Sequence, residues 1–247
     1  MTHSYKEIFY PESRFGGFTD INSTMVFYTR INSLLDSSCT VLDVGCGRGG
    51  AMEDPIDIRR NLRDLKGKVR KVIGIDVGEA GKENPCLDEF RLIEGDLWPI
   101  EESTIDLIVC DCVLEHIASP DKFFSEVRRV LRNGGHLCLR TPNSWGYVAL
   151  CARVIPNKLH ARVTRMARGG GKEEDVFPTV YRCNSLWRIR SMMKQYGLRH
   201  VVYGYASEPW YFSFSRIAYA VGALYHKLIP AFLKPEILGF GQLKKDS

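Results

Sequence analysis

Short, almost continuous apolar runs recur along the chain and are separated by polar or helical stretches. They occupy residues 40–45, 71–76, 90–94, 105–110 and 135–140, and two further strands are predicted near 199–204 and 237–245. Runs rich in valine, isoleucine and leucine that alternate with helices are typical of a parallel sheet covered on both faces. The pattern therefore predicts an α/β fold.

Two helices are predicted near the start of the sheet, one before the first strand and one between the first two strands. Residues 21–36 place apolar side chains roughly on one side, which predicts a helix before the first strand. The pair Asp54-Pro55 predicts an N-cap followed by proline at the first helical position, with the helix running to about Leu65 before Gly67.

Two later helices carry similar signals. Ser119-Pro120 repeats the N-cap and proline arrangement, and we expect that helix to end at the turn containing Gly134. Asn184 is predicted to cap the next helix, which should stop at Gly197.

A last helix is expected in residues 209–233, between the final two strands. Its apolar positions recur at helical spacing: Ile217, Val221, Leu224 and Leu228. Packing of this stripe on the sheet is the favoured interpretation. The alternative is an interfacial helix that touches a membrane, with Arg216 and Lys227 at the headgroups.

Length and composition fit one such domain. The 247 residues are 45% hydrophobic and 26% charged, with a net charge of +5, which is too mild to favour a nucleic-acid partner. No stretch reaches the roughly 18 apolar residues of a membrane-spanning helix. We expect a lead-in and helix over 1–36 and a single domain over 37–247, with a cap insertion over 143–183 and the helical insertion over 209–233.

Cysteine usage suggests the compartment. The eight cysteines are scattered without a C-x-x-C pair, and several lie in apolar runs, where thiols behave as small hydrophobic groups. The N-terminus also shows no charged-then-apolar leader. These features predict a reducing, cytoplasmic location.

The stretch VLDVGCGRGG, residues 41–50, carries the first chemical signal. Gly45, Gly47 and Gly50 satisfy G-x-G-x-x-G, which alone is weak evidence for a dinucleotide and also suits a tight turn without a ligand. Asp43 stands two residues earlier, at the carboxyl end of a strand. A carboxylate there is costly unless it meets hydrogen-bond donors or a cation, and a ligand with an ammonium group supplies both.

Two further strand ends carry acids. Asp76 ends VIGID, where an acid accepts both hydroxyls of a ribose. Asp96 and Leu97, in EGDLWP, are placed to meet the amino edge and the face of an adenine, although a plain Gly-Asp turn explains them equally well. Ligands of open α/β sheets bind outside the carboxyl ends of the strands, so these groups should line one crevice. No metal site is predicted.

In order along residues 40–143, VLDVGCGRG, VIGIDV, EGDLWPI, IDLIVCDCVLEHIASPDKFFSEVRRVLRNGGHL and RTPN resemble the motifs of class I S-adenosylmethionine-dependent methyltransferases. The resemblance implies a Rossmann-like, doubly wound, seven-stranded, mostly parallel sheet with helices on both faces. It also implies S-adenosylmethionine as cofactor and a cap insertion between strands five and six. The lengthened first crossover, with Pro55 near its start, departs from the pattern.

The resemblance also implies the cofactor contacts. Besides Asp43, they are Gly45, Cys46 and Gly47 at the methionine part, Asp76 and Val77 at the ribose, Asp96 and Leu97 at the adenine, and Asp111 and Cys112 at the methionine end. Arg30 is expected to reach the cofactor carboxylate, as N-terminal arginines do in some relatives.

Methyl transfer requires alignment of the nucleophile with the methyl carbon, and a general base only for some acceptors. His116 is one candidate base, although ordering of the loop after strand four is the favoured interpretation. His160 and Tyr181 are weaker candidates. The expected acceptor is a small molecule or a saccharide, with a lipid-linked acceptor as an option.

Two other functions stay open on the sequence. An NAD-dependent oxidoreductase accounts for the glycines and Asp76 but not for Asp43 or the Gly-Asp-Leu turn. A cofactor-binding regulatory protein without catalysis is the second, although the predicted cofactor loops look intact.

Overall fold

The computed structural model describes residues 5–154 and 178–245. Its centre is a seven-stranded sheet with the order β3-β2-β1-β4-β5-β7-β6. The strands are β1 (Thr40–Val44), β2 (Lys71–Asp76), β3 (Glu89–Leu92), β4 (Ile105–Asp111), β5 (Leu131–Pro142), β6 (Leu198–Tyr205) and β7 (Glu236–Leu243). Only β7 runs antiparallel to its neighbours, β5 and β6. The predicted α/β class and the doubly wound, mostly parallel sheet are confirmed.

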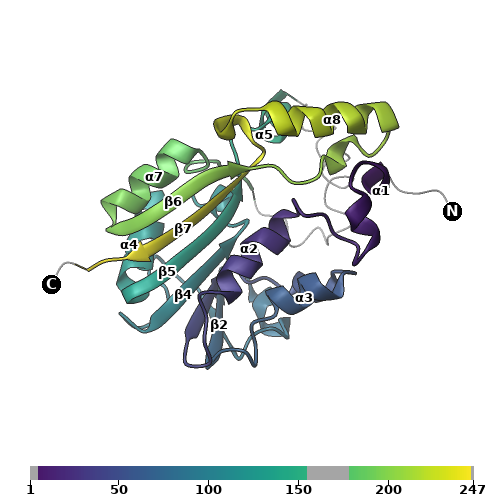
Figure 1. Cartoon of the computed structure of the whole chain (residues 1–247). Coiled ribbons are helices and arrows are strands. Elements are labelled where there is room, and N and C mark those ends of the chain that lie inside the picture. Colours follow the sequence, from purple (N-terminus) through teal and green to yellow (C-terminus); the bar gives the residue numbers. More distant parts are fainter. Residues whose placement is uncertain (1–4, 155–177, 246–247) are drawn as a thin grey trace.

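Helices cover both faces of this sheet (Figure 1). The described α-helices are α1 (Tyr5–Phe9), α2 (Ser23–Asn32), α3 (Asp57–Arg63), α4 (Pro120–Val130), α5 (Tyr147–Val154), α7 (Leu186–Gln195) and α8 (Arg216–Leu228). The described 3₁₀ turns are η1 (Pro11–Arg14), η2 (Gly50–Glu53), η3 (Glu79–Glu83), η4 (Leu114–His116), η6 (Trp210–Phe212) and η7 (Ala231–Leu233).

Two apolar layers hold the sheet between these helices. On one face, Phe124 of α4 and Ile189 of α7 pack on the strands in a large buried cluster. On the other face, Phe27 and Ile31 of α2 form a second buried cluster with strand residues such as Val109. Burial on both faces explains why the strands read as continuous apolar runs.

The helix α2 is shorter than the predicted 21–36, and three other predicted helix ends are wrong by one to a few residues. Asp54 is not an N-cap, because α3 begins at Asp57 after Ile56, and the Asp54 carboxylate instead accepts from Ile56 N and pairs with Arg59. A residue before proline favours extended backbone, and Asp54 has φ −64° and ψ 122°.

The other two differences lie at α4 and α7. The helix α4 begins at Pro120 as predicted but ends at Val130, and Gly134, with φ +85°, lies inside the irregular start of β5. The N-cap of α7 is Ser185, whose Oγ accepts from Arg188 N, rather than Asn184.

The helix α8 does not bury its predicted stripe. Ile217 and Leu228 are 77% and 73% exposed, and Val221 and Leu224 are also exposed. The buried residues of α8 are instead Tyr219, Gly222, Ala223 and His226. Tyr219 packs against aromatic rings of the N-terminal segment, including Phe9 of α1 at 5.4 Å between ring centroids. The favoured expectation, that the stripe packs on the sheet, is therefore wrong.

Candidate functional site

The glycine turn after β1 is held in a shape that favours glycine. Gly45 has φ +68°, and its amide donates to Ile75 O at 2.8 Å. A Cβ at Gly45 would lie 2.5 Å from Cγ2 of Val113, whereas a Cβ at Gly47, with φ +49°, would have no atom within 4 Å. The turn is therefore packed on one side and open at Gly47.

Asp76 fastens this turn to the end of β2. One carboxylate oxygen accepts from Gly47 N at 3.1 Å and the other from Gly78 N at 3.0 Å, and the residue is buried. The adjacent Val77 is exposed. Since a carboxylate accepts more than two hydrogen bonds, Asp76 keeps capacity for a hydroxyl of a ligand.

Asn84 supports the same turn and was missed in the sequence. Its amide donates to Cys46 O at 2.9 Å and to Gly47 O at 3.2 Å. Cys46 itself is half-buried, its Sγ lies close to Gly74, and burial raises the pKa of its thiol. The Cys46 side chain is therefore directed towards Gly74 and Gly81, and its backbone is held in the turn by Asn84.

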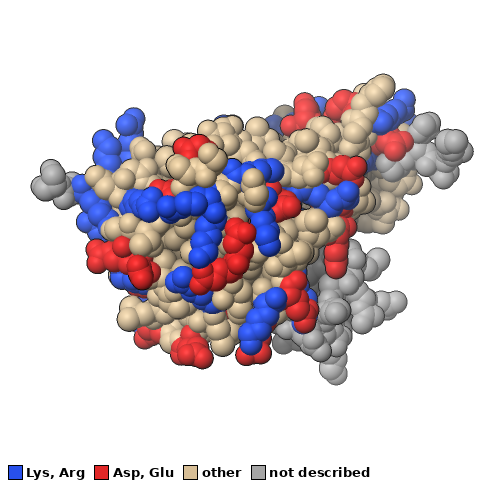
Figure 2. Space-filling view, turned by 90° about the horizontal axis from the view of Figure 1, so that it is seen from below, with Lys and Arg blue, Asp and Glu red and all other residues tan. Residues whose placement is uncertain are grey.

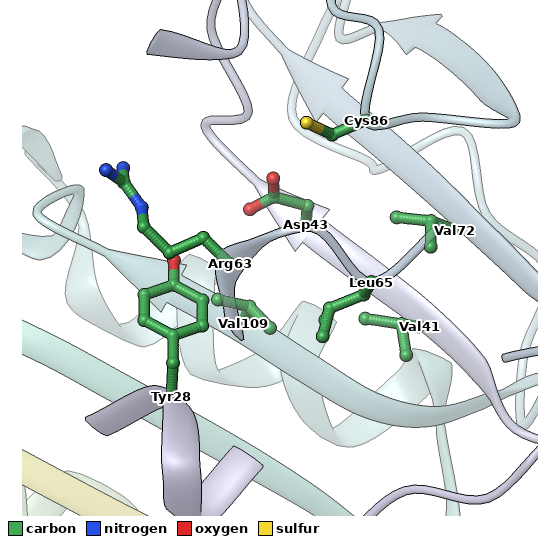
Figure 3. A pocket seen from close by; sticks show the side chains of 8 residues that line it. All are labelled: Tyr28, Val41, Asp43, Arg63, Leu65, Val72, Cys86 and Val109. Atoms are coloured by element: carbon green, nitrogen blue, oxygen red, sulfur yellow. The ribbon is translucent and has the colours of Figure 1, made fainter. Parts of the chain in front are cut away.

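Asp43 lies at the carboxyl end of β1, beside a cavity of about 20 Å³. Figure 3 shows the side chains of Tyr28, Asp43 and Arg63, from α2, β1 and α3, around this cavity. Burial, together with the neighbouring carboxylate of Asp111, raises the pKa of Asp43 to about 7, although Arg63 opposes the shift. Asp43 is therefore an acid that lacks a stabilising cation in direct contact among the described residues.

Asp111, at the end of β4, has its carboxylate occupied by protein donors. Arg140 of β5 donates to both oxygens, at 2.7 and 2.8 Å, and Tyr28 Oη donates to one of them at 3.0 Å. Arg140 also donates to hydroxyls of Ser23 and Thr24, at the start of α2. The pair therefore fixes α2 over the carboxyl edge of the sheet, and neither Arg140 nor Tyr28 was predicted for the site.

The remaining predicted cofactor residues lie along the carboxyl edge of the sheet, except for Arg30. Asp96 is exposed and pairs with Lys122 at 2.7 Å, and both Leu97 and Cys112 are exposed. Arg30 does not join the group, since its guanidinium lies 6.0 Å above the ring of Phe240 in β7.

The candidate bases lie beyond β4 and in the predicted cap. His116 Nδ1 lies 3.0 Å from Pro178 O, so its ring contacts the loop that precedes α7. In that loop, the amides of Val180 and Tyr181 donate to Glu115 O. His160 lies outside the described residues.

Glu115 is the buried acid of this region, and it was not predicted. Its Oε2 accepts from Thr141 Oγ1 at 2.9 Å, and Asn184 donates to the same hydroxyl at 2.6 Å. Burial raises the pKa of Glu115, although the hydrogen bonds oppose this shift. These contacts join the ends of β4 and β5 to the start of α7.

This geometry fits S-adenosylmethionine at the edge formed by β2, β1 and β4. The partly buried Asp43 can receive an ammonium group, Asp76 has free acceptor capacity, and Gly47, whose amide donates to Asp76, leaves open space beside it. Among the described residues, no cluster of histidine, cysteine, aspartate and glutamate is arranged to hold a metal ion.

Comparison with known proteins agrees with this geometry. A family model described as a methyltransferase domain matches residues 35–176. The chain therefore belongs to the methyltransferase-domain family, in the class I S-adenosylmethionine-dependent group, which confirms the family, fold and cofactor predicted from the motifs.

Three similar proteins illustrate the family. A probable S-adenosylmethionine-dependent methyltransferase of Mycolicibacterium smegmatis is 33% identical over 42% of this chain and 38% of its own length. The sterol 4-C-methyltransferase strm-1 of Caenorhabditis elegans is 31% identical over 41% of this chain and 30% of its own length. The match thus spans well under half the length of either relative.

The third is a solved structure, geranyl diphosphate C-methyltransferase of Streptomyces coelicolor with S-adenosyl-L-homocysteine. It has a TM-score of 0.53 and 13% identity, and the alignment covers 89% of this chain and 75% of that one. At this identity the likeness concerns the fold alone.

Proposed function

We propose that the chain transfers the methyl group of S-adenosylmethionine to a small organic acceptor at the carboxyl edge of β4 and β5. The cofactor supplies a methyl group already activated on a sulfonium. The residues of this chain then have to orient the two reactants and exclude water, since alignment lowers the barrier without covalent catalysis. The observation that carries the proposal is the juxtaposition of Asp43, Asp76 and the open Gly47 turn.

We further propose that the acceptor has a large apolar part. Trp145, Trp187 and Phe232 form a partly exposed ring cluster beyond the end of β5, with centroid distances of 6.2 and 5.8 Å. The similar proteins named above act on a sterol and on geranyl diphosphate. A small lipid, or a saccharide carried on a lipid, fits both observations.

The exposed face of α8 supports a membrane surface as the source of this acceptor. It presents Ile217, Val221, Leu224 and Leu228 to solvent, and Phe214 just before the helix is 78% exposed. Residues 209–235 contain no aspartate or glutamate, although they contain Arg216, Lys227 and Lys234. An apolar face on a segment whose own charges are all basic suits the interface of an anionic bilayer.

This face is joined to the acceptor edge. The side-chain amide of Asn143, directly after β5, donates to Phe232 O and Lys234 O at 2.8 Å each. A bilayer that contacts α8 would therefore lie close to the end of β5, where the acceptor is proposed to react. No helix in the described part of the chain is long and apolar enough to cross a bilayer.

We expect the protein to act in the cytoplasm and without nucleic acid. Seven of the eight cysteines, Cys39, Cys46, Cys86, Cys110, Cys112, Cys138 and Cys183, are free thiols, which suits a reducing compartment. On the face seen in Figure 2, Lys and Arg side chains are interspersed with Asp and Glu, so no broad basic surface is present there. An extended basic surface is what a nucleic-acid partner requires.

Two measurements test the proposal. Protein incubated with S-adenosylmethionine labelled on the methyl group and with a cell extract should place label in the organic phase. A Gly47→Ala variant is the control that blocks the cofactor site. Label confined to the aqueous phase would contradict an apolar acceptor, and complete absence of labelled product would favour a cofactor-binding protein without catalysis.

Flotation with liposomes tests the membrane contact separately. The protein should float with vesicles that contain phosphatidylglycerol, and Val221→Glu with Leu224→Glu should abolish flotation while S-adenosylhomocysteine binding persists. Val201→Glu, at an exposed apolar position of β6, is the matched control and should still float. A wild-type protein that never floats would remove the membrane contact and leave the methyl transfer itself standing.

A further inference from the structure

A second hollow lies away from the cofactor edge, on the face of β6 and β7 beside α2. It is an open groove of about 1070 Å³. In Figure 1, α7 lies behind these two strands, and α2 lies to one side of them on the nearer face. The strands therefore carry a helix on one face and a groove on the other.

The floor of the groove is aromatic. Tyr203 of β6 and Phe240 of β7 stack with an interplanar angle of 27° and a centroid distance of 6.5 Å. Val201, which pairs with Phe240 in the sheet, is 64% exposed. A strand residue of this type is normally covered, so the floor offers apolar surface that a ligand can bury.

The charged side chains around the floor are all basic. Arg30 of α2 lies 6.0 Å above the ring of Phe240, and Arg199 of β6 also lines the groove. His136 and His200 also line the groove, and none of its lining residues is acidic. An occupant with a negative group is therefore favoured.

Tyr203 gives an independent indication. Its hydroxyl is buried and has no hydrogen-bond partner among the described residues. A buried polar group without a partner is costly, by about 1–3 kcal/mol, and a native structure rarely keeps one without a reason. An oxygen-bearing ligand at the floor would supply the partner once a change in χ1 of Tyr203 brings the hydroxyl to the groove.

The same features argue against other occupants. A second copy that docked this face on itself by two-fold symmetry would place the surface that carries Arg30 and Arg199 against the same cationic surface, with no carboxylate among the groove-lining residues of either copy. A flat bilayer does not enter a concave groove. The volume lies just above the range of about 300–1,000 Å³ that is usual for small-molecule sites.

We propose that the groove between α2 and the β6–β7 face binds a single-chain organic anion, with its apolar chain on Tyr203, Val201 and Phe240 and its carboxylate or phosphate at Arg199 and Arg30. This site is separate from the proposed methyl-transfer site, so its test does not depend on that activity.

Equilibrium dialysis below the micellar concentration tests the site with three probes of equal chain length. Dodecanoate and dodecyl phosphate distinguish the two anion sources, and dodecanol lacks the charge. At least one anion should bind about tenfold more tightly than dodecanol, because Arg199 and Arg30 pair only with the charged probes. Equal binding of the anions and the alcohol would overturn the proposal.

Two groove variants and one control locate the binding. Arg199→Gln removes a cation, and Val201→Glu adds a carboxylate at an exposed position, so each should weaken anion binding by about fivefold to tenfold. Ile217→Glu, on the apolar face of α8, should leave it unchanged. Binding of S-adenosylhomocysteine reports that each variant folds. Folded groove variants with unchanged anion affinity, or loss of affinity in Ile217→Glu, would contradict the assignment.

Discussion

Arg140 and Asp111 form a two-pronged ion pair between neighbouring strands, with N–O distances of 2.7 and 2.8 Å. Each side chain is only 12% exposed. Burial alone would raise the pKa of Asp111, but the Arg140 guanidinium outweighs it and lowers the pKa below the usual value. Both residues are therefore charged in the folded protein, and each depends on the other.

Removal of Arg140 should be strongly destabilising. In Arg140→Gln, the Asp111 carboxylate stays buried without its cation, and such broken pairs typically cost about 3–5 kcal/mol. Urea denaturation at pH 7 should show a loss of this size in the free energy of unfolding. The double variant Arg140→Gln with Asp111→Asn should recover part of it, because no unpaired charge remains. A single variant within about 1 kcal/mol of the wild type would show that the pair is not needed.

The proton on Asp43 should make the folded protein less stable as the pH rises. Its pKa is about 7 in the folded state, against 3.8 for the unfolded reference, so the folded protein keeps a proton that the unfolded chain loses. Stability from this group is present below pH 3.8 and is lost as the pH rises towards 7. Asp43→Asn should flatten this part of the profile in denaturant unfolding from pH 5 to pH 8.

Binding of S-adenosylhomocysteine should displace the proton that Asp43 carries in the free protein. An ammonium group beside Asp43 favours the carboxylate, so S-adenosylhomocysteine should release up to one proton on binding near pH 6.5. Calorimetry in two buffers of different ionisation enthalpy measures this release, and Asp43→Asn should abolish it. Identical proton release in the variant would place the ammonium group elsewhere.

The sheet and the glycine turn were predictable because their signals are local. The run 71–76 corresponds to β2 residue for residue, since burial on both faces leaves a continuous apolar sequence. The positions of Gly45 and Asp76 follow from the same strand ends. The ends of parallel strands meet at one edge, so sequence order was sufficient to place these groups together.

The partners of Asp43 and Asp111 were not predictable, because they come from distant segments. Arg140 is 29 residues from Asp111, and no local pattern marks their pairing. Arg63 lies near Asp43, whereas Arg30, which was expected at the cofactor carboxylate, is on the side of α2 that faces β7.

The sequence of α8 also does not determine which face of the helix is buried. Periodicity identified the stripe of Ile217 and Leu228, but the opposite face carries Tyr219 and Ala223 and is apolar as well. When both faces of a helix are apolar, the period does not determine which one is buried. That choice is made here by the aromatic rings of the N-terminal segment around Tyr219.

A methyl group at Gly47 should block the cofactor while leaving the fold intact. The Cβ of Gly47→Ala meets no protein atom within 4 Å and enters the open side of the turn. The positive φ of +49° costs about 1–2 kcal/mol for alanine. Gly134→Ala is the matched control, because Gly134 has φ +85° and equally open surroundings but lies near the start of β5, at the end of the sheet opposite the carboxyl edge.

Calorimetric titration with S-adenosylhomocysteine separates the two glycine variants. Both should lose similar stability in thermal unfolding, and only Gly47→Ala should lose ligand affinity, by tenfold or more. Equal affinities in the two variants would mean that the turn at Gly47 is not the cofactor surface.

His116 should act by holding a loop rather than by moving a proton. Its Nδ1 contacts Pro178 O, and the adjacent Glu115 carbonyl receives the amides of Val180 and Tyr181. In His116→Ala, hydrogen exchange at those two amides should therefore accelerate about tenfold or more, because local opening becomes easier. Affinity for S-adenosylhomocysteine should stay within about twofold, since these contacts lie beyond the turn at Gly47. Unchanged exchange, together with loss of the acidic limb of the pH–rate profile for label transfer, would instead identify His116 as a general base.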